Sequence, residues 1–174
     1  MSRLRWFDRK FDRTFPVELH PEILERLRGT PGRLAERTGT LSRDVLTRRS
    51  AQGWSIQEHV GHIADLDDGI FFSRLSAYRN GEAMLPAADL TNAATDAAHH
   101  NDRSINEVLE SARLARGRFI AELESLDDEI FARTSTHPRL GTPMRLVDMM
   151  FFVAEHDDHH LATITELTRA SAAT

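Results

Sequence analysis

Two Ser-x-x-Glu segments constrain the fold of this chain more than any other feature of its sequence. They lie at Ser55–Glu58 and Ser104–Glu107. In this arrangement the serine oxygen accepts a backbone N–H at the start of a helix, and the glutamate accepts the N–H of the serine in return. Each segment therefore predicts the first turn of a helix.

The two helices predicted from these starts each carry a further signal. The first runs to about Arg79, where Asn80-Gly81 ends it. The second places its apolar residues on one side, as expected for a helix that packs against a core. These apolar residues are Val108, Ala112, Ala115, Phe119, Leu123 and Leu126.

A shorter helical region precedes these two helices. Pro21 begins a helical run that Gly29 interrupts, and Thr30-Pro31 is then typical of an N-cap followed by proline at the first helical position. The sequence leaves open whether the two pieces form one kinked helix or two separate helices.

The remaining segments complete an all-helical pattern. Residues 80–103 contain Pro86 and no clear period, so they are predicted to form a long crossover that lets the flanking helices run parallel. After the connection HPRLG at 137–141, Thr142-Pro143 is predicted to start a last helix that runs to about Leu167. No segment shows sustained strand alternation. We therefore predict an all-α four-helix bundle with a long crossover between the second and third helices.

The length and composition favour one domain. The 174 residues are predicted to form a single unit, 1–174, with an N-terminal arm at 1–18 and a helical bundle at 21–169. The net charge of −5 argues against a surface that binds nucleic acid or anionic lipid. No segment approaches the ~20 apolar residues of a membrane span, and the N-terminus lacks the apolar segment of a signal peptide. We expect a cytoplasmic protein without nucleic-acid or membrane partners.

Histidines supply the chemistry that the sequence suggests. His156 and His160 are four residues apart, which places both side chains on the same face of the last helix as apolar residues such as Val153 and Ile164. A lone histidine on such a face is usually a core residue with a hydrogen-bonded neighbour. Two together are harder to explain in this way, because burying imidazoles costs solvation free energy that a bound metal ion would offset. Periodicity alone leaves the metal site and the core interpretation both open.

A third metal ligand is expected from the helix that Ser55 begins, which offers His59 and His62. The apolar residues of this helix lie nearer His59, so the helical wheel does not decide between them. However, Trp54 and His59 occupy the two positions that pack together in a hydrophobic staple. His62 is then the freer ligand, although this argument alone leaves the choice open.

Several other groups could assist a metal site. Asp65 and Glu155 could accept the outer N–H of a ligand histidine, but we favour surface positions for both. His159 could assist the ligands, carry a proton or be solvated, and His137 could line the mouth of the site. The remaining histidines are interpreted as surface residues: His20, His99 and His100.

Two segments together resemble the DinB/YfiT superfamily. WSIQEHVGHIADL resembles the start of the second helix in that family, where a metal-binding histidine follows a tryptophan by eight residues, and AEHDDHHLATI resembles its last-helix pair of histidines. The resemblance implies a four-helix bundle in which His62, His156 and His160 bind one divalent metal ion. Zinc or nickel is expected first, and manganese, iron or cobalt would also suit nitrogen ligands.

Three histidines leave a metal with an open coordination position, as in catalytic sites. The chain contains no cysteine, so any thiol chemistry would need a thiol from a small molecule. The resemblance implies such chemistry: a metal-dependent thiol S-transferase that uses a low-molecular-weight thiol. The alternatives are a metal-dependent hydrolase that uses a bound water, and a non-catalytic stress or ligand-binding bundle. An absent Glu-x-x-His motif excludes a ferritin-like di-iron site.

The helix that Ser55 begins carries a second apolar row: Val60, Ala64, Phe71, Leu75 and Tyr78. One bundle cannot easily bury this row together with the apolar residues on the histidine side. A homodimer through this helix is therefore predicted, unless the N-terminal arm covers the row.

Overall fold

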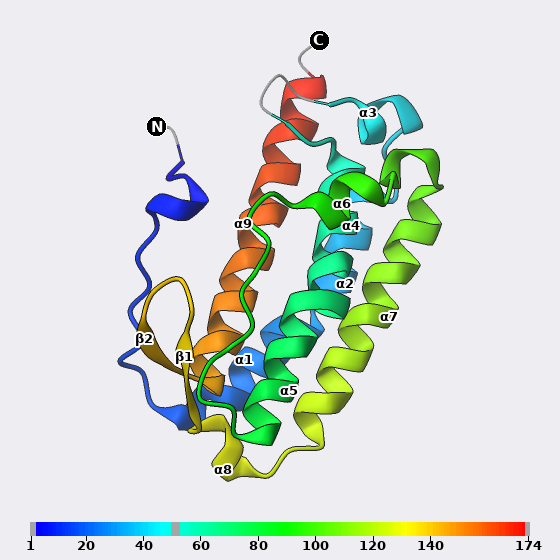
Figure 1. The fold of residues 1–174 in the computed structure, drawn as a ribbon. Helices are drawn as coiled ribbons and strands as arrows, with labels where there is room; N and C mark the ends of the chain where they lie inside the picture. The colour runs from blue at the N-terminus through cyan, green and yellow to red at the C-terminus, as the bar shows by residue number, and fades with distance from the viewer. Residues whose placement is uncertain (1–2, 50–52, 173–174) are drawn as a thin grey trace.

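Four helical columns form a bundle in the computed structural model, which describes residues 3–49 and 53–172 (Figure 1). The first two residues of the predicted arm and the last two of the chain lie outside the described residues. The columns are α1 His20–Arg28 with α2 Thr30–Thr38, α4 Ile56–Leu66 with η3 Asp67–Phe71 and α5 Phe72–Asn80, α7 Ile105–Glu124, and α9 Leu146–Ala172. The predicted four-helix architecture is confirmed.

The first column is one helical path with a break. Gly29 keeps a right-handed helical conformation, and the N–H groups of Gly29 and Arg33 continue the hydrogen-bond ladder across the junction. The prediction that Thr30 is an N-cap is wrong. Its hydroxyl instead donates to Asp157 on α9 at 2.8 Å, because this residue lies inside the bundle, where the buried carboxylate needs a donor.

Both predicted capping boxes are present. Ser55 accepts the N–H of Glu58, which accepts the N–H of Ser55, and the same reciprocal pair forms at the start of α7. The helix that Ser55 begins ends at Asn80, and Gly81 follows in the left-handed conformation with φ +70°. Its middle turn, η3, is a π-helix that the sequence did not predict.

The crossover returns the chain to the start of α4 before α7 begins. It contains α6 Ala93–Ala97 and η4 His100–Asp102. The side chain of Gln57 donates to the backbone oxygens of His100 and Arg103, so the starts of α4 and α7 lie together. The second and third columns therefore run parallel, as predicted, and Figure 1 shows both descending in the same direction.

A short hairpin stands where the sequence predicted the start of the last helix. β1 Thr134–His137 and β2 Thr142–Arg145 pair antiparallel, with Gly141 at φ +64° in the turn between them. The prediction that Thr142-Pro143 starts the helix is therefore wrong. The backbone of Thr136 also bonds to the crossover at Ala83 and Leu85, which gives these residues strand partners. α9 begins only at Leu146.

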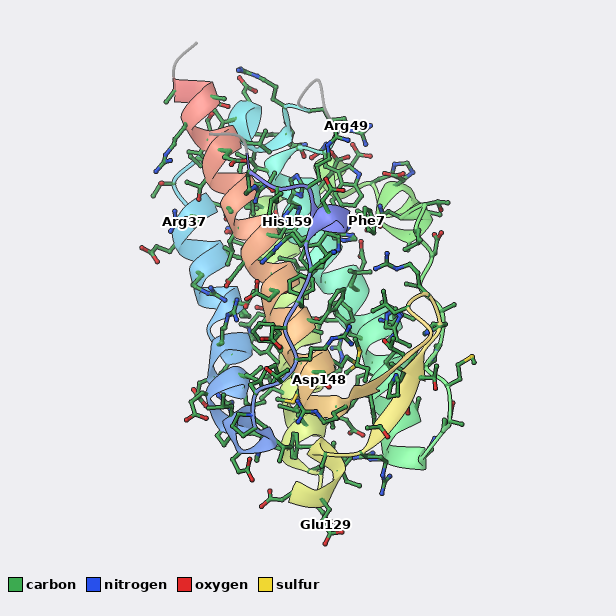
Figure 2. All side chains as sticks on the ribbon, turned by 90° about the vertical axis from the view of Figure 1, so that its left-hand side faces the viewer. Phe7, Arg37, Arg49, Glu129, Asp148 and His159 are labelled. Atoms are coloured by element: carbon green, nitrogen blue, oxygen red, sulfur yellow. The ribbon has the colours of Figure 1, made fainter. Side chains whose placement is uncertain are left out.

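The N-terminal arm lies along α9. η1 Trp6–Asp8 places Trp6 5.2 Å from the ring of Phe152, and Phe15 lies 5.2 Å from Phe151. Figure 2 shows this arm crossing the face of α9 at the level of His159. The remaining short elements are η2 Val17–Leu19, α3 Arg43–Thr47 and α8 Asp128–Phe131. Within the described residues, every helix is too short or too polar to cross a lipid bilayer.

The second apolar row of α4 and α5 is buried within the single chain. Val60 and Ala64 pack with residues of α7 such as Ala112, and Leu75 and Tyr78 join a second core cluster with residues of α7 and α9. The expectation that one bundle cannot bury both rows is wrong, because the long α7 covers this side of the helix. The arm covers α9 instead. The homodimer stays a prediction, but the second apolar row no longer supports it, because the row is buried within one chain.

An ion network occupies the centre of the bundle. The guanidinium of Arg116, on α7, donates to Asp67 at 2.8 Å and to Asp157 at 2.6 Å, and all three side chains are almost fully buried. It also donates to the backbone oxygen of Leu27 at 3.1 Å. Since the donors and acceptors satisfy each other, this network fixes all four columns at one level.

Replacing Arg116 by methionine tests the network. The change leaves two buried carboxylates without their cation, so we expect the free energy of unfolding to fall by about 3–5 kcal/mol in urea denaturation. The control is Arg118→Met, which removes an exposed pair with Asp68 and is expected to cost about 1 kcal/mol or less. Equal losses in the two variants would contradict this account.

Candidate metal centre

Three histidines from two columns meet inside the bundle. His62 comes from α4, and His156 and His160 come from α9; all three are buried. One ring nitrogen from each lies within 4.8 Å of the others, and the Nε2 atoms of His156 and His160 are 3.1 Å apart. The structure thus brings together the three residues that the sequence proposed as metal ligands.

A hydrogen-bonded chain orients His62. Its Nδ1 lies 2.9 Å from the hydroxyl of Thr95 on α6, and that hydroxyl donates to Asp65 at 2.8 Å. Because the hydroxyl proton is directed at the carboxylate, Nδ1 of His62 carries a proton and donates it to Thr95. The lone pair is then on Nε2, the nitrogen left for a metal. The expectation that Asp65 is only a surface acid is therefore wrong.

His100 completes this chain and was missed by the sequence analysis. It is buried, not a surface residue as expected, and its Nε2 donates to Asp65 at 2.9 Å. Its ring lies against Gly61, where an added Cβ would come within 2.3 Å of the ring atoms. The local signal in the sequence is Gly61, the glycine before His62. It indicates that another group packs closely against α4, but it does not identify that group as His100.

His59 has two contacts. Its ring packs edge-on against Trp54 at 5.6 Å, which is the staple contact that the sequence predicted. Its Nδ1 also lies 2.8 Å from Nδ1 of His160. If His160 offers Nε2 to a metal, its Nδ1 carries the proton and donates it to His59. His59 therefore orients His160 as Thr95 orients His62.

The arrangement fits a divalent metal ion. Two nitrogens bound to zinc at 2.0–2.1 Å in tetrahedral geometry lie about 3.3 Å apart, close to the observed spacing of His156 and His160. The buried Nδ1 of His156 has no hydrogen-bond partner among the described residues, so this ring is not held as a satisfied core histidine would be. Three neutral nitrogens suit zinc, nickel, iron and cobalt.

Burial keeps these imidazoles neutral. It lowers the pKa of His62 to about 4, and burial together with the neighbouring histidines lowers the pKa values of His156 and His160 well below the ordinary value. Neutral imidazoles have the lone pairs that metal binding requires, so these ligands need not lose a proton at neutral pH.

The three histidines open into a cavity of about 460 Å³. Its walls are mainly apolar, with contributions from α4, α5, α9, the crossover and the arm. They include Trp54, Leu66, Ile70, Phe71, Leu90 and Phe152. The cavity is large enough for a small organic molecule, and it brings such a molecule directly to the histidines.

The other residues considered from the sequence fall into separate places. His137 lines the cavity, as predicted, and His159 lines it as well, while the roles considered for His159 stay predictions. Glu155 pairs with Arg9 of the arm and with Arg26 of α1, so it does not orient a ligand histidine, and it is half-buried where a surface position was expected. His99 is exposed, as expected. His20 is half-buried and stacks on Phe131 at 4.1 Å, which the surface interpretation did not predict.

Comparison with known protein families identifies the chain. The sequence profile of the DinB superfamily matches residues 26–164. The chain belongs to the DinB superfamily. The match begins near the end of α1, ends within α9 and includes the three histidines. Comparison with functionally curated proteins finds no match.

Two solved structures share the fold of this DinB-superfamily protein. YfiT from Bacillus subtilis, a probable metal-dependent hydrolase with an unusual four-helix bundle topology, matches with a TM-score of 0.79 and 22% identity over 94% of both chains. The mycothiol-dependent maleylpyruvate isomerase matches with a TM-score of 0.66 and 11% identity over 85% of this chain and 60% of its own. The predicted YfiT-type bundle is confirmed.

Gly61→Ala tests the hydrogen-bond network of Thr95, Asp65 and His100 that orients His62. The new Cβ would displace the ring of His100 and weaken its hold on Asp65, so we expect metal affinity to fall roughly tenfold or more. Zinc affinity can be measured by competition with a chromogenic chelator. The control is Gly117→Ala in α7, where an added Cβ meets open space. An unchanged affinity in Gly61→Ala would contradict the role of this network.

The buried histidines also predict how stability depends on pH. Their native pKa values lie below the unfolded value of about 6.5, so between pH 6.5 and 4 the unfolded chain binds protons that the native metal-free protein does not. Stability is therefore lost as pH falls, by about 1.4 kcal/mol per pH unit for each such histidine. Burial raises the pKa of Asp67 to about 6, so below this pH the native protein binds one proton that the unfolded chain does not. This single proton opposes the loss of stability caused by the histidines.

Urea denaturation of the metal-free protein at pH 7.5, 6.0 and 5.0 measures this slope. His62→Gln removes one of the histidines and is expected to reduce the slope by about one proton. A stability that is independent of pH over this range would show that the histidines titrate normally in the native protein.

Proposed function

We propose that this DinB-superfamily protein is a metal-dependent thiol S-transferase. His62, His156 and His160 would hold a divalent ion, with zinc or nickel expected first. The observation that carries the proposal is the set of three neutral imidazoles at the inner wall of a mainly apolar cavity of about 460 Å³. Such a set leaves a coordination position open toward the cavity.

A divalent ion in this position lowers the pKa of a thiol or a water that binds to it. The chain has no cysteine, so the sulfur would come from a small molecule in the cavity. Small thiols are kept reduced in the cytoplasm, which is where we propose that the protein acts. The fold similarity to a mycothiol-dependent isomerase supports a thiol as cosubstrate.

The charges around the histidines favour an anionic group at the open position. The three histidines are neutral. The carboxylate of Asp65 does not contact His62 in this hydrogen-bond network, because the hydroxyl of Thr95 lies between them. The ligands would therefore not neutralise the two positive charges of a divalent ion. In a buried site, these charges would strongly stabilise an anion bound at the open position.

The walls of the cavity support group transfer. Apolar side chains such as Leu66 and Phe71 exclude water from one side of the site, and Trp54 packs 4.6 Å from the ring of His62. With His160 donating to its Nδ1, His59 carries its proton on Nε2 and can donate a hydrogen bond to a substrate. These residues would hold an electrophile next to the thiol.

Hydrolysis by a metal-bound water is the second function that a specific observation favours. The similarity to YfiT, a probable metal-dependent hydrolase, covers 94% of both chains. The same ligands and the same open position would serve either reaction. The two functions differ in whether turnover requires a thiol.

A conjugation assay separates the possibilities. Zinc- and nickel-loaded protein would be incubated with monochlorobimane and either cysteine or N-acetylcysteine, and a parallel sample with a nitrophenyl ester and no thiol. We expect a metal-dependent thiol conjugation rate that His156→Ala reduces roughly 100-fold or more. The control is His99→Asn, at an exposed position whose φ of +47° asparagine tolerates.

Each outcome has a clear meaning. Metal-dependent ester hydrolysis without thiol conjugation would replace the transferase by the hydrolase. Rates that are indifferent to metal and to His156→Ala would overturn both and leave a non-catalytic ligand-binding bundle.

A further inference from the structure

Arg74 is a buried cation that faces the cavity without a carboxylate partner. It lies on α5 with 3% of its surface exposed, and it lines the same cavity as the three histidines. Its Nε donates to the backbone oxygen of Pro86 at 3.0 Å, and no ion pair to it forms among residues 3–49 and 53–172. Arg116, which is buried to the same degree, holds two carboxylates.

Burial of an unpaired guanidinium is costly. Desolvation, with Arg139 nearby, lowers the pKa of Arg74 from its ordinary value. A buried charge normally has a counter-charge, and a structure that leaves one open toward a cavity favours an anion there. The terminal nitrogens of Arg74 are the donors that such an anion would meet, because Nε is already occupied.

Two further donors lie around Arg74. Nδ1 of His137 accepts the N–H of Leu140 at 3.3 Å, and burial lowers the pKa of His137 to about 4, so the neutral ring carries its proton on Nε2. Arg139, in the turn of the hairpin, is exposed and places its guanidinium 5.4 Å from the ring of Phe7 on the arm. All three side chains line the cavity.

The acid that lines the cavity in the described residues is engaged elsewhere. The carboxylate of Asp89 accepts the N–H and the hydroxyl of Thr91 and the N–H of Ala93, which hold the crossover loop before α6. Its pKa is lowered by these hydrogen bonds from Thr91 and Ala93. Within the part of the chain that the structure describes, no carboxylate therefore forms an ion pair with Arg74.

Apolar surface separates Arg74 from the histidines. Arg74 follows His62 by twelve residues on the same helical column, so the two residues lie roughly three helical turns apart along it. Leu66, Ile70 and Phe71 lie between them in sequence and line the cavity. A ligand that reaches both ends must have an apolar middle.

We propose that Arg74, assisted by His137 and Arg139, binds the carboxylate of an elongated apolar carboxylic acid whose other end points toward the histidines. A planar guanidinium and a carboxylate form paired, charge-assisted hydrogen bonds, which are strongest away from water. The identity of this acid as a substrate rests on the proposed function, whereas its binding does not, since the carboxylate is held by the chain alone.

Tryptophan fluorescence provides a direct measurement. The chain contains two tryptophans, and both Trp6 and Trp54 line the cavity. Metal-free protein would be titrated with octanoate and with octanamide, which has the same length and no charge. Removing the metal excludes a carboxylate–metal contact as the cause of any preference. We expect octanoate to bind at least about tenfold more tightly than octanamide.

Variants assign the preference to Arg74. Arg74→Gln is expected to remove the preference for octanoate, and Arg74→Lys to retain part of it. Arg139→Gln changes an exposed residue and is expected to weaken octanoate binding about threefold without affecting the fold. The control is Arg79→Gln on the same helix, where Arg79 pairs with Glu122 outside the cavity.

The outcomes are distinct from those of the conjugation assay. Equal affinities for octanoate and octanamide in the wild-type protein would overturn the proposal, even if Arg74→Gln fails to fold. Tighter binding of octyl phosphate than of octanoate would overturn the assignment to a carboxylate. Because the titration uses no metal and no thiol, a failed transferase assay leaves its result intact.

Discussion

A single guanidinium joins all four helical columns of this protein. Arg116 on α7 holds Asp67 of the second column and Asp157 of α9, and it also bonds to the backbone of α1 at Leu27. Thr30 of α2 donates to the same Asp157. The charges are buried, so the columns cannot shift past one another without leaving a carboxylate or the guanidinium without partners. Asp157 lies between His156 and His160 on α9, so its fixed position sets the orientation of both histidines.

The metal centre is built from neutral groups on this fixed frame. Burial keeps the three histidines unprotonated, and each outer nitrogen that has a partner finds it on a different element: Thr95 on α6 for His62, and His59 on α4 for His160. The crossover therefore does more than connect two parallel helices, because it carries Thr95 and His100 to the back of the site. On the open side, the same crossover, the arm and the hairpin surround a cavity with histidines at one end and Arg74 further along the column.

Local signals predicted most of the fold and the shared buried face of His156 and His160, whereas His62 was chosen over His59 only through the family resemblance. The capping boxes, Gly81 and the spacing of His156 and His160 each act over a few residues. The structure confirms the helix starts, the helix end and the burial of both histidines on one face of α9. Contacts between distant segments were not predictable from one sequence. The burial of His100 depends on Gly61 and Asp65, which lie some forty residues earlier. In the sequence alone, Arg116 looks the same as an arginine on the exposed surface of a helix. The hairpin was missed because its two short strands lack an alternating pattern and form partly through contacts with the crossover.

The central claim is that three histidines form one metal site, and calorimetric titration of zinc into metal-free protein tests it most directly. The account predicts one zinc ion per chain in the wild-type protein and in His99→Asn, and a loss of that binding in His62→Ala and in His160→Ala, with all four proteins folded by circular dichroism. Zinc binding that is absent from the wild-type protein, or that persists unchanged in both alanine variants, would contradict it.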